Sequence, residues 1–359
     1  MELDITKTHT LLKAYEAIPP VPSFLKDRYF PTNAQTDVFN TDDVLIDYKD
    51  GTKKAAPFVL PMVGGAIIER GGFTTDKFEP PLIAPARNLT IDDLKKRGFG
   101  EAIFSGMSPA QREAMITLRD LQELDRMTTR REEIMAAEIL LTDQCVMKHF
   151  KDADGSTTED KVLKFHTEGS NPYTYTTTVG WDKTGAKILQ DIYAMTRMLT
   201  DRGLPAEDLI VAGDVADAII NDATLQKLLD NNRMNLGGIA PLELPSGAAH
   251  IGTLNVFGKL IKIIAYTETY ADKDGRLIPY IPAGQIVLTA PNAGRGLYGA
   301  VTQLEMDGEF YSYAGRRVPL YRPDFTNNTR KLVLSSCPVL VPRSKGAWIS
   351  AKVTGELGG

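Results

Sequence analysis

The stretch that decides the fold is residues 108–150, SPAQREAMITLRDLQELDRMTTRREEIMAAEILLTDQCVMKHF. Ser108 is a favourable N-cap, Pro109 suits the first helical position, and Gln111 completes a capping box. No glycine or proline occurs from 110 to 150, so we predict one continuous helix over 108–150. At ~1.5 Å a residue, about 40 residues make a rod of about 60 Å. Because such a rod exceeds the width of a small domain, we expect it to be a spine along which other parts lie.

Apolar residues are sparse in the first half of this predicted helix and dense in the second, while residues 125–133 between them are strongly charged. A coiled-coil dimer is one interpretation, but an a/d heptad does not continue across the charged middle. We therefore expect a helix that packs at one end and crosses solvent or a neighbouring subunit at the other. The mixed signs predict ion pairs across the helix surface or with a neighbour, rather than a nucleic-acid stripe. The contact candidates there are Arg126, Arg130, Arg131 and Glu132.

The composition is that of a globular protein with two or more domains, since 43% of the 359 residues are hydrophobic and 24% are charged. The net charge of −5 is mild, so we do not expect strong nonspecific binding to DNA or to anionic membranes. The two cysteines have no framework spacing and indicate a reducing compartment. The first ten residues lack signal-peptide features, and no apolar run is long enough to span a membrane. We expect a soluble protein made in a cytoplasm, with no membrane partner.

Residues 1–48 are predicted to be an N-terminal arm rather than a domain. Two short helical patches, 8–17 and 23–27, are separated by the segment IPPVP at 18–22, which holds the chain extended. The apolar side chains of the patches need a surface, either on the same chain or on a neighbour. We expect residues 1–30 to matter more for assembly than for folding.

Residues 49–100 are predicted to complete a β-hairpin, with strands at 43–48 and 55–60, and then to form an extended loop. A segment so long and so rich in Gly and Pro is unusual inside a compact domain and is typical of one that reaches a partner. The part from 61 to 88 also carries apolar side chains that would form an exposed patch on a monomer. The contact candidates in it are Arg70, Gly71, Gly72, Phe73 and Phe78.

The chain after this loop divides into three further parts. Residues 101–182 hold the spine helix and a predicted turn at 152–155, where a hairpin explains the aspartate pair better than a calcium loop does, because the later ligands are missing. Residues 183–285 have alternating helical and strand patterns and are predicted to be an inserted α/β domain. Residues 286–359 are rich in strand patterns.

One motif, Gly294-Arg295-Gly296-Leu297-Tyr298-Gly299, matches the dinucleotide-binding pattern G-x-G-x-x-G. Residues 298–302 have a strand pattern, however, and without a helix N-terminus the pyrophosphate has no favourable dipole. We interpret Gly294, Arg295, Gly296, Tyr298 and Gly299 as a structural turn between two strands. The four histidines and two cysteines have no metal-ligand spacing, so we predict no metal, no cofactor and no catalytic site.

The order of these parts resembles the Hong Kong 97-type fold of tailed-phage capsid proteins, and more closely the lambda-like major capsid family (phage capsid protein E). The segments that carry the resemblance are RYFPT at 28–32, PMVGG at 61–65, ERGG at 69–72, QIVL at 285–288, RGLYG at 295–299 and SSCPVL at 335–340. The resemblance implies an α+β fold with an N-terminal arm at 1–48 and a β-hairpin and extended loop at 49–100. It further implies a peripheral domain at 101–182, an axial domain at 183–285 and a return to the peripheral domain at 286–359.

The family implies a subunit of the head of a tailed double-stranded DNA bacteriophage or prophage, which forms hexamers and pentamers of an icosahedral shell. Its implied partners are copies of itself, a scaffolding protein, a portal and packaged DNA without sequence-specific contact, with a decoration protein as a further candidate. Its implied location is the virion capsid, after synthesis in the cytoplasm of the bacterial host. Two alternatives stay open: a nucleotide- or sugar-binding enzyme centred on 183–285, and a phage tail or baseplate structural protein.

Overall fold

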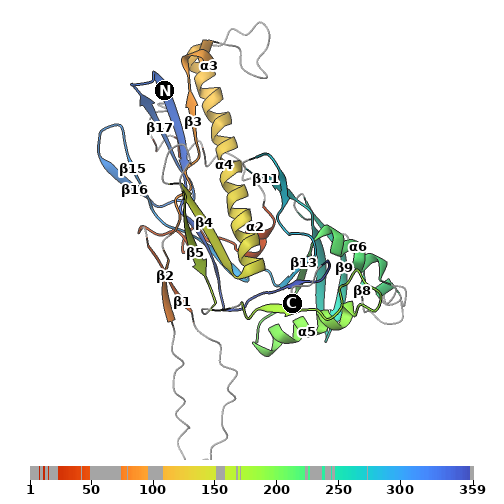
Figure 1. Cartoon of the computed structure of the whole chain (residues 1–359). Coiled ribbons are helices and arrows are strands. Elements are labelled where there is room, and N and C mark those ends of the chain that lie inside the picture. Colours follow the sequence, from red (N-terminus) through yellow and green to blue (C-terminus); the bar gives the residue numbers. More distant parts are fainter. Residues whose placement is uncertain are drawn as a thin grey trace, which may run out of the picture.

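The structure is a computed structural model of the chain (Figure 1). It describes residues 8, 11, 12, 15, 23–41, 43–48, 74–78, 80–95, 108–150, 158–166, 169, 171–222, 225, 226, 237, 238, 244, 247–272 and 274–355. Helices and strands are mixed among them, in agreement with the predicted α+β class. Within these ranges no helix is both long enough and apolar enough to cross a membrane.

The long helix α4 spans Pro109–Thr142, so its 34 residues form a rod of about 51 Å. Its start is the predicted one. The Ser108 hydroxyl accepts a hydrogen bond from the Gln111 N–H, and the Gln111 side chain accepts one from the Ser108 N–H. The capping box therefore sets the first turn of the helix.

The end of α4 differs from the prediction, which extended the helix to residue 150. Asp143 adopts the left-handed conformation with φ of 56°, and its N–H bonds to the Ile139 carbonyl oxygen. Strand β4 (Gln144–Phe150) follows at once, with Cys145 and Met147 buried on alternate positions. Because a left-handed aspartate replaces the usual glycine, no breaker in the sequence marks this stop.

The two halves of α4 pack against two different hydrophobic cores. In the N-terminal half, Leu121 and Leu124 pack with Leu332 and Leu334 of a neighbouring sheet. In the C-terminal half, five residues join the main core of the molecule: Met135, Ala136, Ala137, Ile139 and Leu140. The helix is thus a spine, as predicted, and one face of its charged middle, with Asp125, Glu132 and Glu133, is buried, whereas the arginines of the opposite face are exposed.

The main core is built on a seven-stranded sheet in the order β6–β20–β13–β7–β10–β9–β8. These strands are β6 (Thr174–Thr176), β20 (Ile349–Lys352), β13 (Gln285–Thr289), β7 (Asp208–Val211), β10 (Lys259–Tyr266), β9 (Ala248–Val256) and β8 (Gly237–Gly238). The pairs β6–β20 and β7–β10 are parallel, and the other pairs are antiparallel. Helices α5 (Ile188–Asp201) and α6 (Gly213–Asn221) lie beside this sheet and share its core (Figure 1). Since β6 and β20 come from outside residues 183–285, the sheet is wider than the predicted inserted domain.

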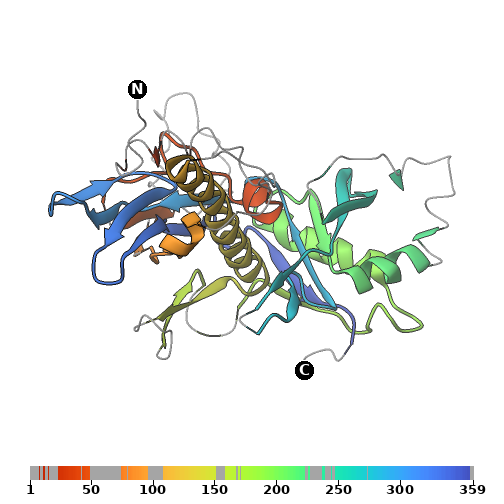
Figure 2. The same cartoon turned by 90° about the horizontal axis from the view of Figure 1, so that it is seen from above.

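The second half of the molecule lies beside the N-terminal part of α4 (Figures 1 and 2). Its three-stranded sheet consists of β17 (Val318–Asp324), β18 (Thr329–Ser335) and β3 (Ala86–Leu89), and the short helix α3 (Ile91–Lys95) follows β3. Strand β14 (Gly294–Tyr298) pairs with β19 (Pro338–Pro342). Strands β15 (Val301–Leu304) and β16 (Phe310–Tyr313) form a hairpin that projects away from α4. Except for β3, all these strands belong to the predicted β-rich return.

The part of the arm from 23 to 41 lies on the core of its own chain. Helix α2 (Leu25–Tyr29) packs against α4, and four large side chains are fully buried: Phe24, Leu25, Tyr29 and Phe30. Residues beyond Phe30 run alongside β14. There the Tyr298 N–H donates to the backbone carbonyl oxygen of Asp37, and the Phe39 N–H donates to that of Tyr298. For this segment, the surface that the sequence left open is therefore on the same chain.

Three smaller pairs of strands complete the described fold. Strand β1 (Val44–Tyr48) pairs with β2 (Thr74–Phe78), while its predicted partner at 55–60 and most of the extended loop lie outside the described residues. Strand β4 pairs with β5 (Thr158–Lys164), as the predicted hairpin requires, although the turn at 152–155 also lies outside them. Strands β11 (Thr269–Ala271) and β12 (Leu277–Pro279) form a short hairpin, and β11 lies near α4 in Figure 1.

Candidate functional site

The charged middle of α4 forms a buried ionic cluster. Asp125 and Glu132 are seven residues apart, so they lie on the same face of the helix. The guanidinium of Arg317, which directly precedes β17, lies between them. Its Nε is 3.0 Å from Asp125 Oδ1, and its Nη1 and Nη2 are 2.7 and 3.0 Å from the two Glu132 oxygens. All three side chains are almost fully buried, so this is an ion-pair network inside one subunit.

Burial and charge act in opposite directions on the pKa values of this network. Burial acts to raise the pKa of Glu132, but the charge of Arg317 outweighs it and lowers that pKa to about 2. Burial likewise acts to lower the pKa of Arg317, yet the Glu132 carboxylate raises it above its ordinary value. Both groups therefore stay charged near neutral pH, and each stabilises the charged form of the other.

Other elements bind the same two carboxylates. The Tyr298 hydroxyl of β14 donates to Glu132 Oε1 at 2.9 Å, and Arg316 Nη2 is 3.2 Å from Glu132 Oε2. The Tyr15 hydroxyl donates to Asp125 Oδ1 at 3.2 Å. With two bonds from Arg317 as well, Glu132 accepts about as many hydrogen bonds as a carboxylate can. Its oxygens are thus used in joining elements and are not available to a substrate or a metal ion.

The next residue of α4, Glu133, fixes the arm helix. Its carboxylate accepts bonds from the backbone N–H groups of Phe24, Leu25 and Lys26 at 3.2, 2.7 and 2.9 Å. The Tyr266 hydroxyl of β10 donates to Glu133 Oε1 at 2.8 Å. These N–H groups begin helix α2 and have no partner within the helix, so Glu133 caps it from another part of the chain. Burial raises the pKa of Glu133 in spite of these bonds.

Other titratable groups with catalytic potential are also enclosed. The His166 Nδ1 lies 3.3 Å from Asp143 Oδ2, and burial raises the pKa of Asp143 to about 6. Burial also raises the pKa of the Cys145 thiol far above its ordinary value, so this cysteine is not an activated nucleophile. Across the part of the chain that the structure describes, no group of three or more His, Cys, Asp or Glu residues is placed to hold a metal ion.

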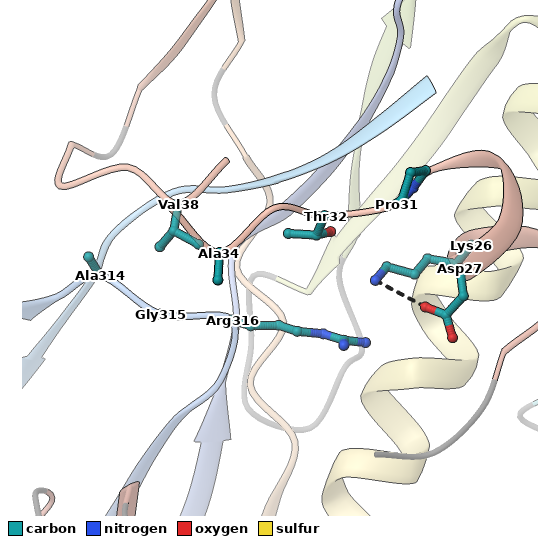
Figure 3. Close-up of a pocket in the computed structure, with 9 residues that line it drawn as sticks. All are labelled: Lys26, Asp27, Pro31, Thr32, Ala34, Val38, Ala314, Gly315 and Arg316. Carbon is teal, nitrogen blue, oxygen red and sulfur yellow. Dashed lines mark hydrogen bonds and ion pairs between the residues drawn. The ribbon is translucent and has the colours of Figure 1, made fainter. Parts of the chain in front are cut away.

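A pocket of about 490 Å³ opens beside the ionic cluster (Figure 3). Its lining consists of Lys26, Asp27, Pro31, Thr32, Ala34, Val38, Ala314, Gly315 and Arg316. The Lys26 Nζ is 3.3 Å from Asp27 Oδ1, and the Arg316 side chain extends toward this pair in Figure 3. Both cations of the pocket already have carboxylate partners, and its lining includes no Ser, Cys or His. These features do not form a catalytic site.

The G-x-G-x-x-G motif is not the turn that we predicted, because residues 294–298 are strand β14 itself. A Cβ on Gly294 would come within 2.3 Å of the Phe30 ring, and one on Gly296 within 2.6 Å of Thr32 Oγ1. The glycines therefore allow the arm to pass close to β14. The next element after Gly299 is strand β15, not a helix, so the motif has no dinucleotide-binding geometry.

The predicted contact residues have different environments. Arg126, Arg130 and Arg131 are exposed on α4. Glu132 is fully buried against Arg317 and therefore cannot contact a neighbour, so that prediction is wrong. Phe78 is wrong for the same reason, because it is buried and stacks on Phe165 with ring centres 5.9 Å apart. Four other candidates, Arg70, Gly71, Gly72 and Phe73, lie outside the described residues.

Sequence reasoning missed the residues that complete the ionic cluster. Arg316 and Arg317 stand in a short segment between two strands, and nothing in their spacing connects them with a helix that ends at Thr142. The only available signal was the charge of the helix middle itself. That pattern is equally typical of a solvated helix face, and the sequence does not distinguish the two.

The chain is similar to capsid proteins of phages and prophages. A family model described as phage major capsid protein E matches residues 7–353. The major capsid protein of Enterobacteria phage P21 is 24% identical over 318 residues, which cover 84% of this chain and 86% of that protein. A putative capsid protein of a prophage of Escherichia coli CFT073 has a structure similar to this one, with a TM-score of 0.66 and 16% identity over 97% of this chain and 99% of that chain. A phage-related protein from Bordetella bronchiseptica RB50 matches with a TM-score of 0.51 and 13% identity over 96% of each chain.

Proposed function

Because the chain belongs to the phage major capsid protein E family, we propose that it builds the hexamers and pentamers of an icosahedral shell around packaged DNA. It is a major capsid protein of a phage or prophage, with the Hong Kong 97-type fold, and it is a structural protein rather than an enzyme. The family match sets aside both alternatives, the nucleotide- or sugar-binding enzyme and the tail or baseplate protein.

The observation that carries the proposed assembly is a basic surface on α4, here called the arginine face: Arg126, Met127, Arg130 and Arg131. All four side chains are exposed, and half of the Met127 surface is open to solvent. Within the described ranges, none of the three arginines has an acidic partner within ion-pair distance. Three unpaired charges around an exposed methionine resemble the apolar centre and polar rim of a protein interface.

A second proposed contact is the part of the extended loop from 61 to 73, which we infer lies on the adjacent subunit. The prediction that all of 61–88 does so is wrong, because residues 74–78 and 86–88 are in strands β2 and β3, which pair with β1 and β18 of the same chain. The support comes from the length of the loop, its Gly and Pro content, and its apolar residues. In a closed ring each subunit would give this loop to the next, in a head-to-tail contact. Arg70, Gly71, Gly72 and Phe73 are its contact candidates, and Gly71 and Gly72 would allow a sharp backbone turn.

The partners of the shell follow from the sequence resemblance and are proposals as well. They are a scaffolding protein and a portal, with a decoration protein as a further candidate. We also propose that the chain is made in the cytoplasm of its bacterial host, and that it contacts DNA without reading its sequence. The net charge of −5 suits a wall along which DNA can move.

Purified protein tests the proposed assembly directly. Negative-stain microscopy and light scattering across a range of concentrations should show closed shells or hexameric rings. The variants Arg70→Glu and Gly72→Val should keep the melting transition of the subunit but lose these assemblies. A chain that stays monomeric at every concentration would contradict the proposal, and normal shells from both variants would contradict the role of the loop.

A further inference from the structure

The β15–β16 hairpin presents an acidic and apolar surface, here called the acidic tip: Glu305, Met306, Asp307, Gly308, Glu309 and Phe310. Phe310 is 74% exposed and Met306 is 55% exposed. The three carboxylates alternate with these two apolar side chains along the sequence. Exposed apolar side chains that lie next to charged ones are typical of a surface that a partner covers.

The acidic tip is held in one conformation by its own hydrogen bonds. The Tyr311 hydroxyl donates to Asp307 Oδ2 at 2.8 Å, and the Glu309 N–H donates to Asp307 Oδ1 at 3.0 Å. The Glu305 N–H donates to the Glu309 carbonyl oxygen at 3.0 Å, and the Tyr313 hydroxyl donates to the Glu305 carboxylate. A tip ordered before binding loses little conformational entropy when it docks.

The arginine face lies on the other side of the subunit. With 3.6 residues per turn, Arg126, Arg130 and Arg131 lie on the face of α4 opposite Asp125 and Glu132, the two carboxylates that bind Arg317. Burial and the charge of Glu138 raise the pKa of Tyr270 in β11, and the charge of Arg131 acts against this rise. Burial has the same effect on Tyr280, and there the charge of Arg130 acts against it. In Figures 1 and 2 the β15–β16 hairpin projects on one side of α4, and β11 lies on the opposite side.

We propose that the acidic tip of one subunit docks on the arginine face of the next copy of this chain. The two surfaces are complementary, because three carboxylates face three arginines and Phe310 and Met306 meet the exposed Met127. Since they lie on opposite sides of the subunit, the contact is head-to-tail and repeats from copy to copy, as a ring requires. This inference rests on the proposed shell function and names the partner of the arginine face.

A charge exchange between the two surfaces tests the pairing. Glu309→Arg and Arg130→Glu each place like charges opposite one another, so each should lower the yield of shells by about ten-fold or more. The double variant restores opposite charges in reversed order and should return to within about two-fold of the wild-type yield. Neither side chain has a partner within the described ranges, so all three variants should keep the wild-type melting temperature.

The matched control is Asp217→Arg, a charge reversal of the same sign at an exposed position of α6. It should leave the shell yield unchanged. As a second readout, Glu309→Cys protein mixed with Arg130→Cys protein should give a disulfide-linked dimer under oxidation, whereas neither variant should crosslink alone.

The outcomes separate this inference from the proposed function. If the wild-type chain forms no assemblies at all, both are wrong. If it forms shells, but the double variant is no better than the single ones and no mixed disulfide forms, only the pairing is wrong. Normal shells from Arg130→Glu would also overturn the pairing, and would leave DNA as the partner of these arginines.

Discussion

Arg317 is the residue through which the two halves of the molecule are joined most directly, because it is fully buried and binds two carboxylates of α4. Replacing it with Ala would leave the buried Asp125 with only the Tyr15 hydroxyl as a partner, and the buried Glu132 with Arg316 as its one remaining ion-pair partner within the described residues. We expect Arg317→Ala to lower the free energy of unfolding by about 3–5 kcal/mol, as measured by urea denaturation. The control is Arg322→Ala, at an exposed position of β17, for which we expect a change within about 0.5 kcal/mol. Equal effects of the two substitutions would contradict a structural role for the cluster.

The lowered pKa of Glu132 predicts how the free energy of unfolding depends on pH. Its pKa is lowered from an ordinary value of 4.5 to about 2, so the unfolded chain takes up this proton at a higher pH than the folded chain does. The stability from its ionisation is therefore present above pH 4.5 and is lost as the pH falls toward 2. The shift corresponds to about 3 kcal/mol. Glu132→Gln should be less stable at pH 7 and should show a flatter stability curve between pH 4.5 and 2, whereas a curve parallel to the wild type would contradict this assignment.

Substitution of Gly294 tests the close contact between the arm and β14. A Cβ there would lie 2.3 Å from Cδ1 of the buried Phe30 ring, so the ring or the strand must move. We expect Gly294→Ala to lower the free energy of unfolding by about 1–3 kcal/mol in a thermal or urea experiment. Gly315→Ala is the matched control, because its new Cβ would meet no atom closer than 3.7 Å. If both variants are as stable as the wild type, the contact is looser than the structure shows.

At the scale of the elements, α4 shows what the sequence pattern can predict. Its first turn follows from residues that are close in sequence, Ser108, Pro109 and Gln111, and the structure confirms it. Its end depends on Asp143 in a left-handed conformation, for which the sequence holds no strong local signal. The burial of Asp125 and Glu132 in its charged middle depends on Arg317, which lies far from them in the sequence. Local patterns therefore located the spine helix but not the partners of its charges.

The arm helix α2 depends on a carboxylate of another element. Removing the Glu133 side chain would leave the N–H groups of Phe24, Leu25 and Lys26 buried without an acceptor. We expect Glu133→Ala to speed amide hydrogen exchange at these three positions by about ten-fold or more, with a smaller change in the β15–β16 hairpin, which projects away from α4. Glu133→Gln retains an acceptor oxygen and should keep much of the protection. Unchanged exchange in the Ala variant would show that α2 is held by packing alone.

At the scale of the whole molecule, the arm segment 23–41 ties the two halves together. Arg28 Nε is 2.5 Å from Asp208 Oδ2 in β7 of the seven-stranded sheet, and the Tyr29 hydroxyl also donates to that carboxylate, at 3.1 Å. The Phe30 ring packs against Trp348, with ring centres 5.7 Å apart. Beyond Phe30 the segment bonds to β14 in the other half. The order of the parts revealed an arm and the family, but it did not reveal that this arm is part of the core.

These buried contacts of the arm reverse the expectation from sequence that residues 1–30 serve assembly more than folding. Their deletion removes four fully buried side chains, Phe24, Leu25, Tyr29 and Phe30, worth about 2 kcal/mol each. The sum of about 8 kcal/mol is comparable with the whole stability of a typical domain, about 5–15 kcal/mol. We expect the truncated chain to lack a cooperative melting transition in calorimetry and to be digested quickly by protease. The milder variant Phe30→Ala should still fold, with unfolding free energy lower by about 3–5 kcal/mol. A truncated chain that melts at the wild-type temperature would show that the cores on either side of α4 are complete without the arm, and that its buried contacts serve only the assembled shell.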